Sequence, residues 1–255
     1  MASFDYRTQT QAGRDVAFSQ GLRTHMLQVY NYMASGLFLT GIVAWLAFNN
    51  AVVVNGAGDI TGLTSFGDSI YNSGLRWVIM FAPLAFMLVL SFGVERLRYN
   101  TLQLIFWAFS VAMGLSLASI FMVYTGNSIA RVFFITAASF AGLSLYGYTT
   151  QRDLTGFGTF LIMGLIGLIV ASIVNIFLAS SMLHFIISVV GVLVFAGLTA
   201  YDTQNIKRLY LTHASQGSVG GEEVRGKMVV MGAVSLYLDF INLFLMLLRF
   251  FGERR

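Results

Sequence analysis

Seven apolar stretches, each long enough to cross a lipid bilayer, limit what this 255-residue chain can fold into. A spanning helix needs roughly 20 mostly apolar residues, because each residue rises about 1.5 Å and the hydrocarbon core is about 30 Å thick. The stretches that meet this requirement are 27–48, 77–94, 102–124, 129–148, 157–178, 183–202 and 228–251. They predict an all-α membrane protein with seven transmembrane helices.

The composition supports this class. Hydrophobic residues make up 57% of the chain and charged residues only 10%, whereas a soluble domain has about 25% charged residues. The lysines and arginines are scattered between the apolar stretches, which argues against a nucleic-acid-binding surface. The chain contains no cysteine, so disulfides, thiolate metal sites and cysteine nucleophiles are excluded.

The chain divides into three parts by polarity. Residues 1–26 are polar and mixed in charge, residues 27–251 form the seven-helix domain, and residues 252–255 form a short tail. Two longer connections, 51–76 and 203–227, are polar and rich in glycine, and we expect them to be loops. Because the tails are short and no retrieval signal ends the chain, we expect a multi-pass protein of a bacterial inner membrane.

The distribution of lysine and arginine predicts a cytoplasmic N-terminus, because basic residues are enriched in cytoplasmic segments. With this orientation only Arg76 and Arg131 precede the tail on the opposite side. The cytoplasmic segments then contain Arg7, Arg14, Arg23, Arg96, Arg98, Arg152, Lys207, Arg208, Arg225 and Lys227. The basic residues of the tail argue against this orientation. Two interpretations remain open: the last stretch crosses the membrane, which we favour, or it is re-entrant and returns to the cytoplasm.

Two aspartates lie where a membrane protein rarely places a charge. Asp239 is near the middle of the seventh stretch, where Ser235, Asp239 and Asn242 follow one helical face, and Asp202 ends the sixth stretch. An acid at membrane depth costs about 2.5–3.5 kcal/mol on insertion scales and usually marks a functional site. The polar face must therefore point toward the bundle interior or toward water.

The sixth and seventh stretches can pack as antiparallel neighbours, which would bring Asp202 and Asp239 together. Two carboxylates in a low-dielectric environment cannot both ionise cheaply, so the pair is expected to titrate jointly. When deprotonated, the pair offers hard oxygen ligands to a cation such as calcium, which it would bind transiently during permeation. Protons and calcium would then compete for the same oxygens.

Three charged residues close the second stretch on the predicted cytoplasmic side: Glu95, Arg96 and Arg98. They anchor the helix end at the interface, or one of the arginines pairs with Asp202 and closes the cytoplasmic mouth.

Three motifs occur in the order typical of one known family. They are Tyr201-Asp-Thr-Gln204, the segment Ser235-Leu-Tyr-Leu-Asp-Phe-Ile-Asn-Leu-Phe244, and the fourth-helix segment from Ala141 to Leu154. Together they resemble the Bax inhibitor family and its YccA-like bacterial branch, from about residue 27 to the end. The resemblance implies a fold in which the last helix is central and is surrounded by the other six.

The resemblance also implies a pH-sensitive calcium leak controlled by an aspartate pair, which falls on Asp202 and Asp239 here. An arginine of the second helix latches one aspartate in the family, and Arg96 or Arg98 is the candidate in this chain. Family members are linked to binding other membrane proteins, including a membrane protease. We expect no enzymatic activity and no cofactor; the expected partners are the lipid bilayer, calcium, protons and other membrane proteins.

Three other functions remain open. A regulator that binds another membrane protein would conduct nothing. An intramembrane aspartyl protease fits Tyr201-Asp202, but its second motif should read Gly-x-Gly-Asp, and Leu236-Tyr-Leu-Asp239 is bulky there. A proton-coupled transporter should show an inverted repeat, which this sequence does not display.

Overall fold

A computed structural model describes residues 3–56, 60–215 and 221–255, with side chains from residue 19 onward. Part of the predicted 203–227 connection, residues 216–220, therefore lies outside the described residues. Within the described part the elements are α1 (Ser3–Ala51), β1 (Val52–Val54), β2 (Ile60–Leu63), α2 (Ser65–Tyr71), α3 (Leu75–Gly93), α4 (Tyr99–Leu117), α5 (Ile120–Val123), α6 (Gly126–Thr149), α7 (Thr155–Leu178), α8 (Ser181–Ser215) and α9 (Glu222–Phe251).

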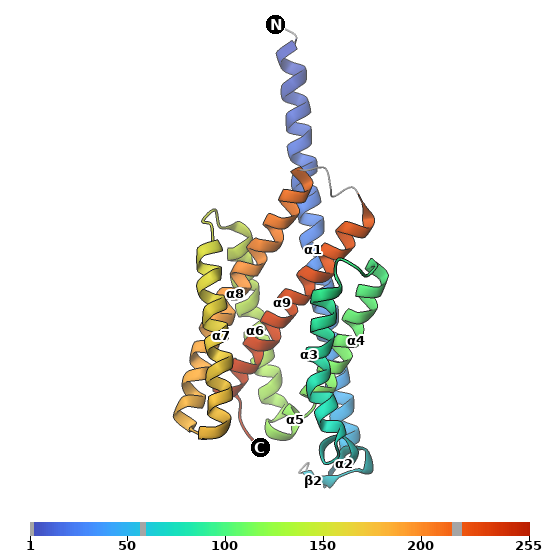
Figure 1. Ribbon diagram of the computed structural model, residues 1–255, viewed down its shortest axis with the longest axis vertical. Coiled ribbons are helices and arrows are strands. Elements are labelled where there is room, and N and C mark those ends of the chain that lie inside the picture. The colour runs from blue at the N-terminus through green and yellow to red at the C-terminus, as the bar shows by residue number, and fades with distance from the viewer. Residues whose placement is uncertain (1–2, 57–59, 216–220) are drawn as a thin grey trace.

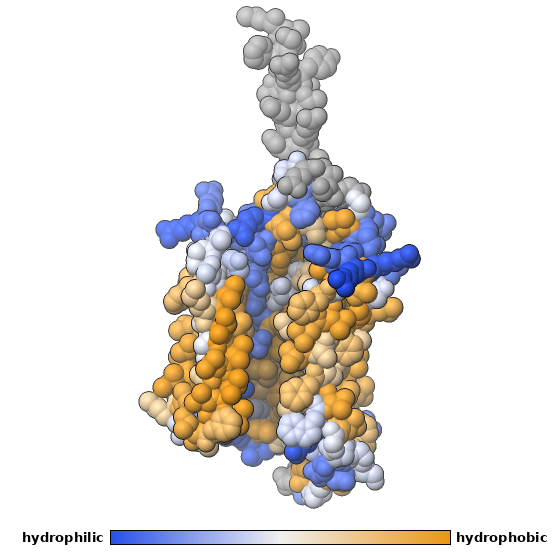
Figure 2. All heavy atoms as spheres, in the orientation of Figure 1, coloured by the Kyte–Doolittle hydropathy of each residue, from blue (hydrophilic) through white to orange (hydrophobic). Residues whose placement is uncertain are grey.

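The predicted seven membrane-spanning helices are confirmed. In the described part of the chain, α1, α3, α6, α7, α8 and α9 are long and apolar enough to cross a bilayer, as is the continuous stretch Tyr99–Val123 formed by α4 and α5. Figure 2 shows a broad hydrophobic band around the middle of the molecule, with hydrophilic residues gathered toward the two ends. The protein is therefore a multi-pass integral membrane protein.

The last helix, α9, is the centre of the bundle, as the family resemblance implied. In the 18-residue apolar stretch of α9, 67% of the residues are buried, against 39% or less in the corresponding stretch of each of the other six spans. Because lipid provides no hydrophobic drive between helices, such a position depends on close packing. Buried small residues such as Gly232 and Ala233 allow neighbouring helices to approach α9 closely.

The arrangement around α9 differs from an even ring of six helices. Four spans, α1, α4, α6 and α8, pack directly against α9. The other two lie outside this layer: α3 packs on α4, and α7 packs on α8. In α3 and in α7, only 11% of the residues in this apolar stretch are buried, which leaves both helices mainly exposed to lipid. Of the six helices that the resemblance placed around α9, four therefore pack against it extensively, and α3 and α7 form an outer layer.

Both of the predicted loops are more regular than expected. The α8 helix continues to Ser215 and α9 begins at Glu222, so most of the predicted 203–227 connection is helical. The predicted 51–76 loop contains the antiparallel β1–β2 hairpin and the short helix α2. Sequence polarity marks where a chain leaves the membrane, but a helix can continue into water because its backbone hydrogen bonds are internal.

The tail is held at the end of the bundle opposite to the start of α9 (Figure 1). The Thr125 amide donates to the Glu253 carbonyl at 3.1 Å, and the Arg255 amide donates to the Val123 carbonyl at 3.0 Å. Arg131 forms an exposed ion pair with Glu253, at 3.2 Å. Because α9 begins at one end of the bundle and ends at the other, the structure favours a crossing helix over a re-entrant one.

Candidate functional site

The helices α8 and α9 are antiparallel neighbours with the most extensive helix–helix contact in the described structure. Their packing brings the side chains of Asp202 and Asp239 within hydrogen-bonding reach of each other. Asp202 is half-buried, whereas Asp239 is only 5% exposed. The two acids singled out in the sequence thus form one site in the interior of the bundle.

One oxygen of this pair receives no hydrogen bond. The Oδ2 atom of Asp239 is buried, and no donor among the described residues bonds to it. Ionised carboxylates only accept hydrogen bonds, so two of them make a direct contact only when one carries a proton. A buried carboxyl with an unused oxygen is costly unless a proton, a water or a cation satisfies it. The geometry therefore suits a site that exchanges a proton for another ligand.

The predicted polar face of α9 is only partly confirmed. Ser235 and Asn242 are half-buried and lie on the more accessible side of α9 together with Leu238, whereas Asp239 turns inward. The Asn242 side-chain amide donates through Nδ2 to the Leu238 carbonyl of its own helix at 2.8 Å. Figure 2 shows the face between α8 and α3, which α9 crosses, as hollowed. Ser235 and Asn242 are thus available to a path along α9, but they do not contact the carboxyl pair directly.

The Tyr201–Gln204 motif has a different partner for each of its four residues. Successive residues of a helix point about 100° apart, so a four-residue run faces the whole circumference. The Tyr201 ring packs against Gly158 of α7, where any side chain would overlap it, and Asp202 meets α9. Thr203 contacts α6 and Gln204 holds the connection between α6 and α7. Tyr201 therefore supports the site by packing and does not enter it.

A chain of hydroxyl groups beside the site was not predicted from the sequence. The Tyr30 hydroxyl is 2.6 Å from the Ser144 hydroxyl, which is 2.9 Å from the hydroxyl of Thr203. The Thr203 hydroxyl donates in turn to the Thr199 carbonyl at 2.8 Å. Ser144 and Thr203 both lie within the motifs that resemble the family. Their place in those motifs is the signal by which the sequence could have identified them. These bonds connect α1, α6 and α8 next to Asp202.

The arginines considered as latches do not reach the carboxyl pair. Glu95, Arg96 and Arg98 are exposed and lie in the turn between α3 and α4. Among the described residues no ion pair joins either arginine to Asp202 or Asp239. The turn is held instead by the Tyr99 amide, which donates to Glu223 at 2.8 Å. In this structure the three residues mark the end of the bundle at which α9 begins.

The fold and the site together define a class: a multi-pass helical membrane protein with a carboxyl pair between its last two helices. Comparison with known proteins narrows this class. Residues 22–255 match the family described as "Inhibitor of apoptosis-promoting Bax1". The chain therefore belongs to the Bax inhibitor family, as the three motifs indicated.

The relatives are bacterial proteins of nearly the same length. The chain is 45% identical to the Rickettsia prowazekii protein RP147 over 252 residues, which cover 98% of this chain and 99% of that protein. It is 46% identical to the inner membrane protein YbhL of Escherichia coli strain K12 over 235 residues, covering 92% and 94% of the two chains. A protein of Caulobacter vibrioides is 45% identical over 249 residues, covering 94% and 93%. These similarities support a bacterial inner-membrane location.

Proposed function

We propose that the protein is a pH-sensitive calcium leak across a bacterial inner membrane, gated by the protonation state of the Asp202–Asp239 pair. The observation that carries this proposal is the contact between the two carboxyl groups inside the bundle, with one buried oxygen unpaired. No chemical step on a substrate is needed for this activity, so the proposed function is not enzymatic.

The chemistry of calcium fits transient binding at this pair. Calcium takes about six to eight oxygen ligands, and carboxylates are its preferred protein ligands. Among the described residues no cluster of three or more His, Cys, Asp or Glu side chains is placed to hold a metal ion. An ion at Asp202 and Asp239 would complete its shell with water or carbonyl oxygens, which favours fast release. A permeation site must bind weakly enough to let the ion leave.

The experiment that tests this function is calcium entry into liposomes that contain the purified protein and a calcium dye. Entry is recorded from about pH 6 to pH 8 for the wild type, Asp202→Asn and Asp239→Asn. One titrating proton changes the ionised fraction by up to about tenfold per pH unit. Asparagine cannot titrate, so we expect either variant to flatten or shift the pH dependence of the flux.

Asp153→Asn is the matched control because Asp153 lies outside the membrane-spanning helices. Hydrogen bonds from the Thr155 hydroxyl and amide, with Arg208 nearby, hold the pKa of Asp153 below its ordinary value. A lowered pKa keeps this carboxylate ionised above its ordinary pKa of about 4, and any stabilisation it provides is lost only below that pH. Asp153→Asn should therefore leave the pH profile between about pH 6 and pH 8 unchanged.

The result also separates the leak from the main alternative, a non-conducting regulator of another membrane protein. Wild-type flux no greater than that of empty liposomes at every pH would contradict the leak. The aspartate pair would then serve the packing of α8 against α9, and the protein would act by binding another membrane protein. Cleavage of a single-span substrate that disappears in Asp239→Asn would point instead to a protease.

A further inference from the structure

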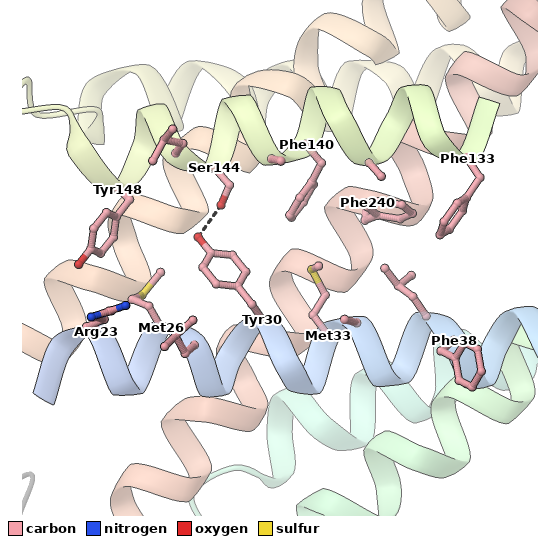
Figure 3. A pocket seen from close by; sticks show the side chains of 16 residues that line it. Arg23, Met26, Tyr30, Met33, Phe38, Phe133, Phe140, Ser144, Tyr148 and Phe240 are labelled. Carbon is pink, nitrogen blue, oxygen red and sulfur yellow. Dashed lines mark hydrogen bonds between the residues drawn. The ribbon is translucent and has the colours of Figure 1, made fainter. Parts of the chain in front are cut away.

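A groove of about 740 Å³ separates α1 from α6, with α9 at its floor. Figure 3 shows the two helices facing each other across it, with Phe240 of α9 between them. Both helices pack against α9, but they do not pack closely against each other. The small side chains of Ala34, Ala137 and Ala141 line the gap and leave the space open. Neither Asp202 nor Asp239 lines this groove, although its Tyr30 and Ser144 belong to the hydroxyl chain beside that pair.

The groove opens sideways toward the position of lipid. Leu27 and Phe38, at its edge, are 51% and 71% exposed, whereas Met33, Phe140 and Phe240 inside it are buried. Its volume is within the range of about 300–1,000 Å³ that is typical of small-ligand sites. Its lining is almost entirely apolar, so a polar solute would lose its hydration without gaining partners.

Away from Arg23 and Tyr148, the two polar side chains of the groove, Tyr30 and Ser144, already satisfy each other. Tyr30 reaches from α1 to Ser144 of α6 with a hydroxyl contact of 2.6 Å, which Figure 3 shows as a dashed line. Ser144 continues to Thr203 at 2.9 Å. A ligand in this part of the groove therefore meets hydrocarbon and needs no hydrogen bonds, as an acyl chain does.

The groove runs lengthwise along α1. Its lining on α1 runs from Arg23 to Phe38, which at about 1.5 Å per residue spans about 22 Å. This length exceeds half of the hydrocarbon core of about 30 Å, so the groove is long enough to cover the depth of one leaflet. An extended chain that starts at the interface has this shape.

The interfacial end of the groove is basic. Arg23 and Tyr148 lie at the same end, on opposite helices (Figure 3). Lys207 does not line the groove but lies beside Tyr148, with its Nζ atom 5.2 Å from the centroid of the Tyr148 ring and donating to the Tyr148 carbonyl at 2.7 Å. No carboxylate is among the described residues that line the groove. Basic pockets between membrane helices bind anionic headgroups, and tyrosine is enriched at the interface.

We infer that this groove binds an anionic phospholipid, with one acyl chain lying between α1 and α6 and the headgroup at Arg23. The inference is independent of the calcium leak because it rests on the shape and the charge of a different site. The bound lipid would fill the space between α1 and α6, which do not pack closely against each other.

The test uses the full-length protein in phosphatidylcholine nanodiscs doped with a photoactivatable probe. The probe is phosphatidylglycerol with a diazirine near the end of one acyl chain, and a phosphatidylcholine with the same acyl chain is compared with it. After illumination, mass spectrometry locates the adducts. We expect adducts concentrated on the facing sides of α1 and α6, with the phosphatidylglycerol probe labelling more strongly.

Two matched pairs of variants test the site. Ala137→Phe fills the groove and should remove most of the labelling, whereas Ala138→Phe, next to it on α6 but outside the groove lining, should not. Arg23→Gln should lower the preference for phosphatidylglycerol about fivefold. Arg98→Gln removes an exposed arginine outside the groove lining and should leave the preference unchanged.

Three results would overturn the inference. The first is labelling spread evenly around the bundle, and the second is equal labelling by the two probes. The third is a protein dimer in native mass spectrometry that Ala137→Phe dissociates while the groove takes no probe, because a second copy would then occupy it. The wild-type adduct map decides the question even if Ala137→Phe fails to fold.

Discussion

At the scale of single residues, the motif around Asp202 works by holding α8 against its neighbours. Gln204 is the clearest case. Its Nε2 atom donates to the Arg152 carbonyl and its Oε1 atom accepts from the Leu154 amide, both at 2.8 Å. One side chain thus fixes both sides of the connection between α6 and α7. The site inherits its geometry from such contacts, because the adjacent Asp202 is carried on the same turn of α8.

We expect Gln204→Leu to destabilise the protein by about 1–3 kcal/mol, because two hydrogen bonds are lost and each contributes about 0.5–1.5 kcal/mol. Denaturant titration of the purified protein measures the change, and hydrogen exchange should increase at residues 150–154. Asn205→Leu is the control, since the Asn205 amide oxygen accepts from Arg208 of the same helix. If both variants destabilise the protein equally, the hydrogen bonds from Gln204 to the α6–α7 connection are not the cause of the lost stability.

At the scale of helices, close approach of backbones decides where α6 crosses α8. A side chain at Gly147 of α6 would overlap the Ala200 carbonyl of α8. Gly142, five residues earlier on the same helix, has open space around the position of a Cβ atom. Small residues at helix contacts are the usual means of packing in membranes, where van der Waals contact replaces the hydrophobic drive.

Gly147→Ala should therefore cost about 1–3 kcal/mol through overpacking at the α6–α8 crossing. Gly142→Ala faces open space and should be neutral, or stabilising by up to about 1 kcal/mol, because alanine is the better helix former. Thermal unfolding in nanodiscs compares the two. A Gly147→Ala variant as stable as the wild type would mean that α6 and α8 are not held as closely as described.

At the scale of the whole molecule, the orientation in the membrane is predicted from the distribution of basic residues, and the contacts of the tail bear on that prediction. The arginines near the C-terminus oppose the predicted orientation, and the structure gives a local contact to one of them, Arg255. Arg131 pairs with Glu253, and the Arg255 guanidinium lies 5.7 Å from the centroid of the Phe48 ring. Arg131, Glu253 and Arg255 therefore take part in contacts at the end of the bundle where the tail lies.

We expect the N-terminus in the cytoplasm and the C-terminus outside. The chain has no native cysteine, so single cysteines at Ser69, Glu222 and Arg255 report position without background. A membrane-impermeant maleimide applied to intact cells should label Ser69→Cys and Arg255→Cys, and should label Glu222→Cys only after permeabilisation. Labelling of positions 222 and 255 from the same side would contradict a crossing α9.

The sequence alone determined the membrane class, the seven spans and the family, and it singled out the two acids on which the proposed function rests. These follow from local properties: a run of about 20 apolar residues must span the bilayer, and an acid within such a run is costly enough to be informative. Helix ends were less predictable, as α8 shows by continuing to Ser215, because a helix satisfies its own backbone beyond the membrane boundary.

Only the tertiary structure decided which residues meet. It placed Asp202 against Asp239, directed Tyr201 toward α7, left Arg96 and Arg98 exposed, and opened the groove between α1 and α6. The spacing of residues along one helix fixes which face they share, but not which helix that face meets. The choice of neighbour depends on the packing of small and large side chains from all seven spans, which no single stretch of sequence contains.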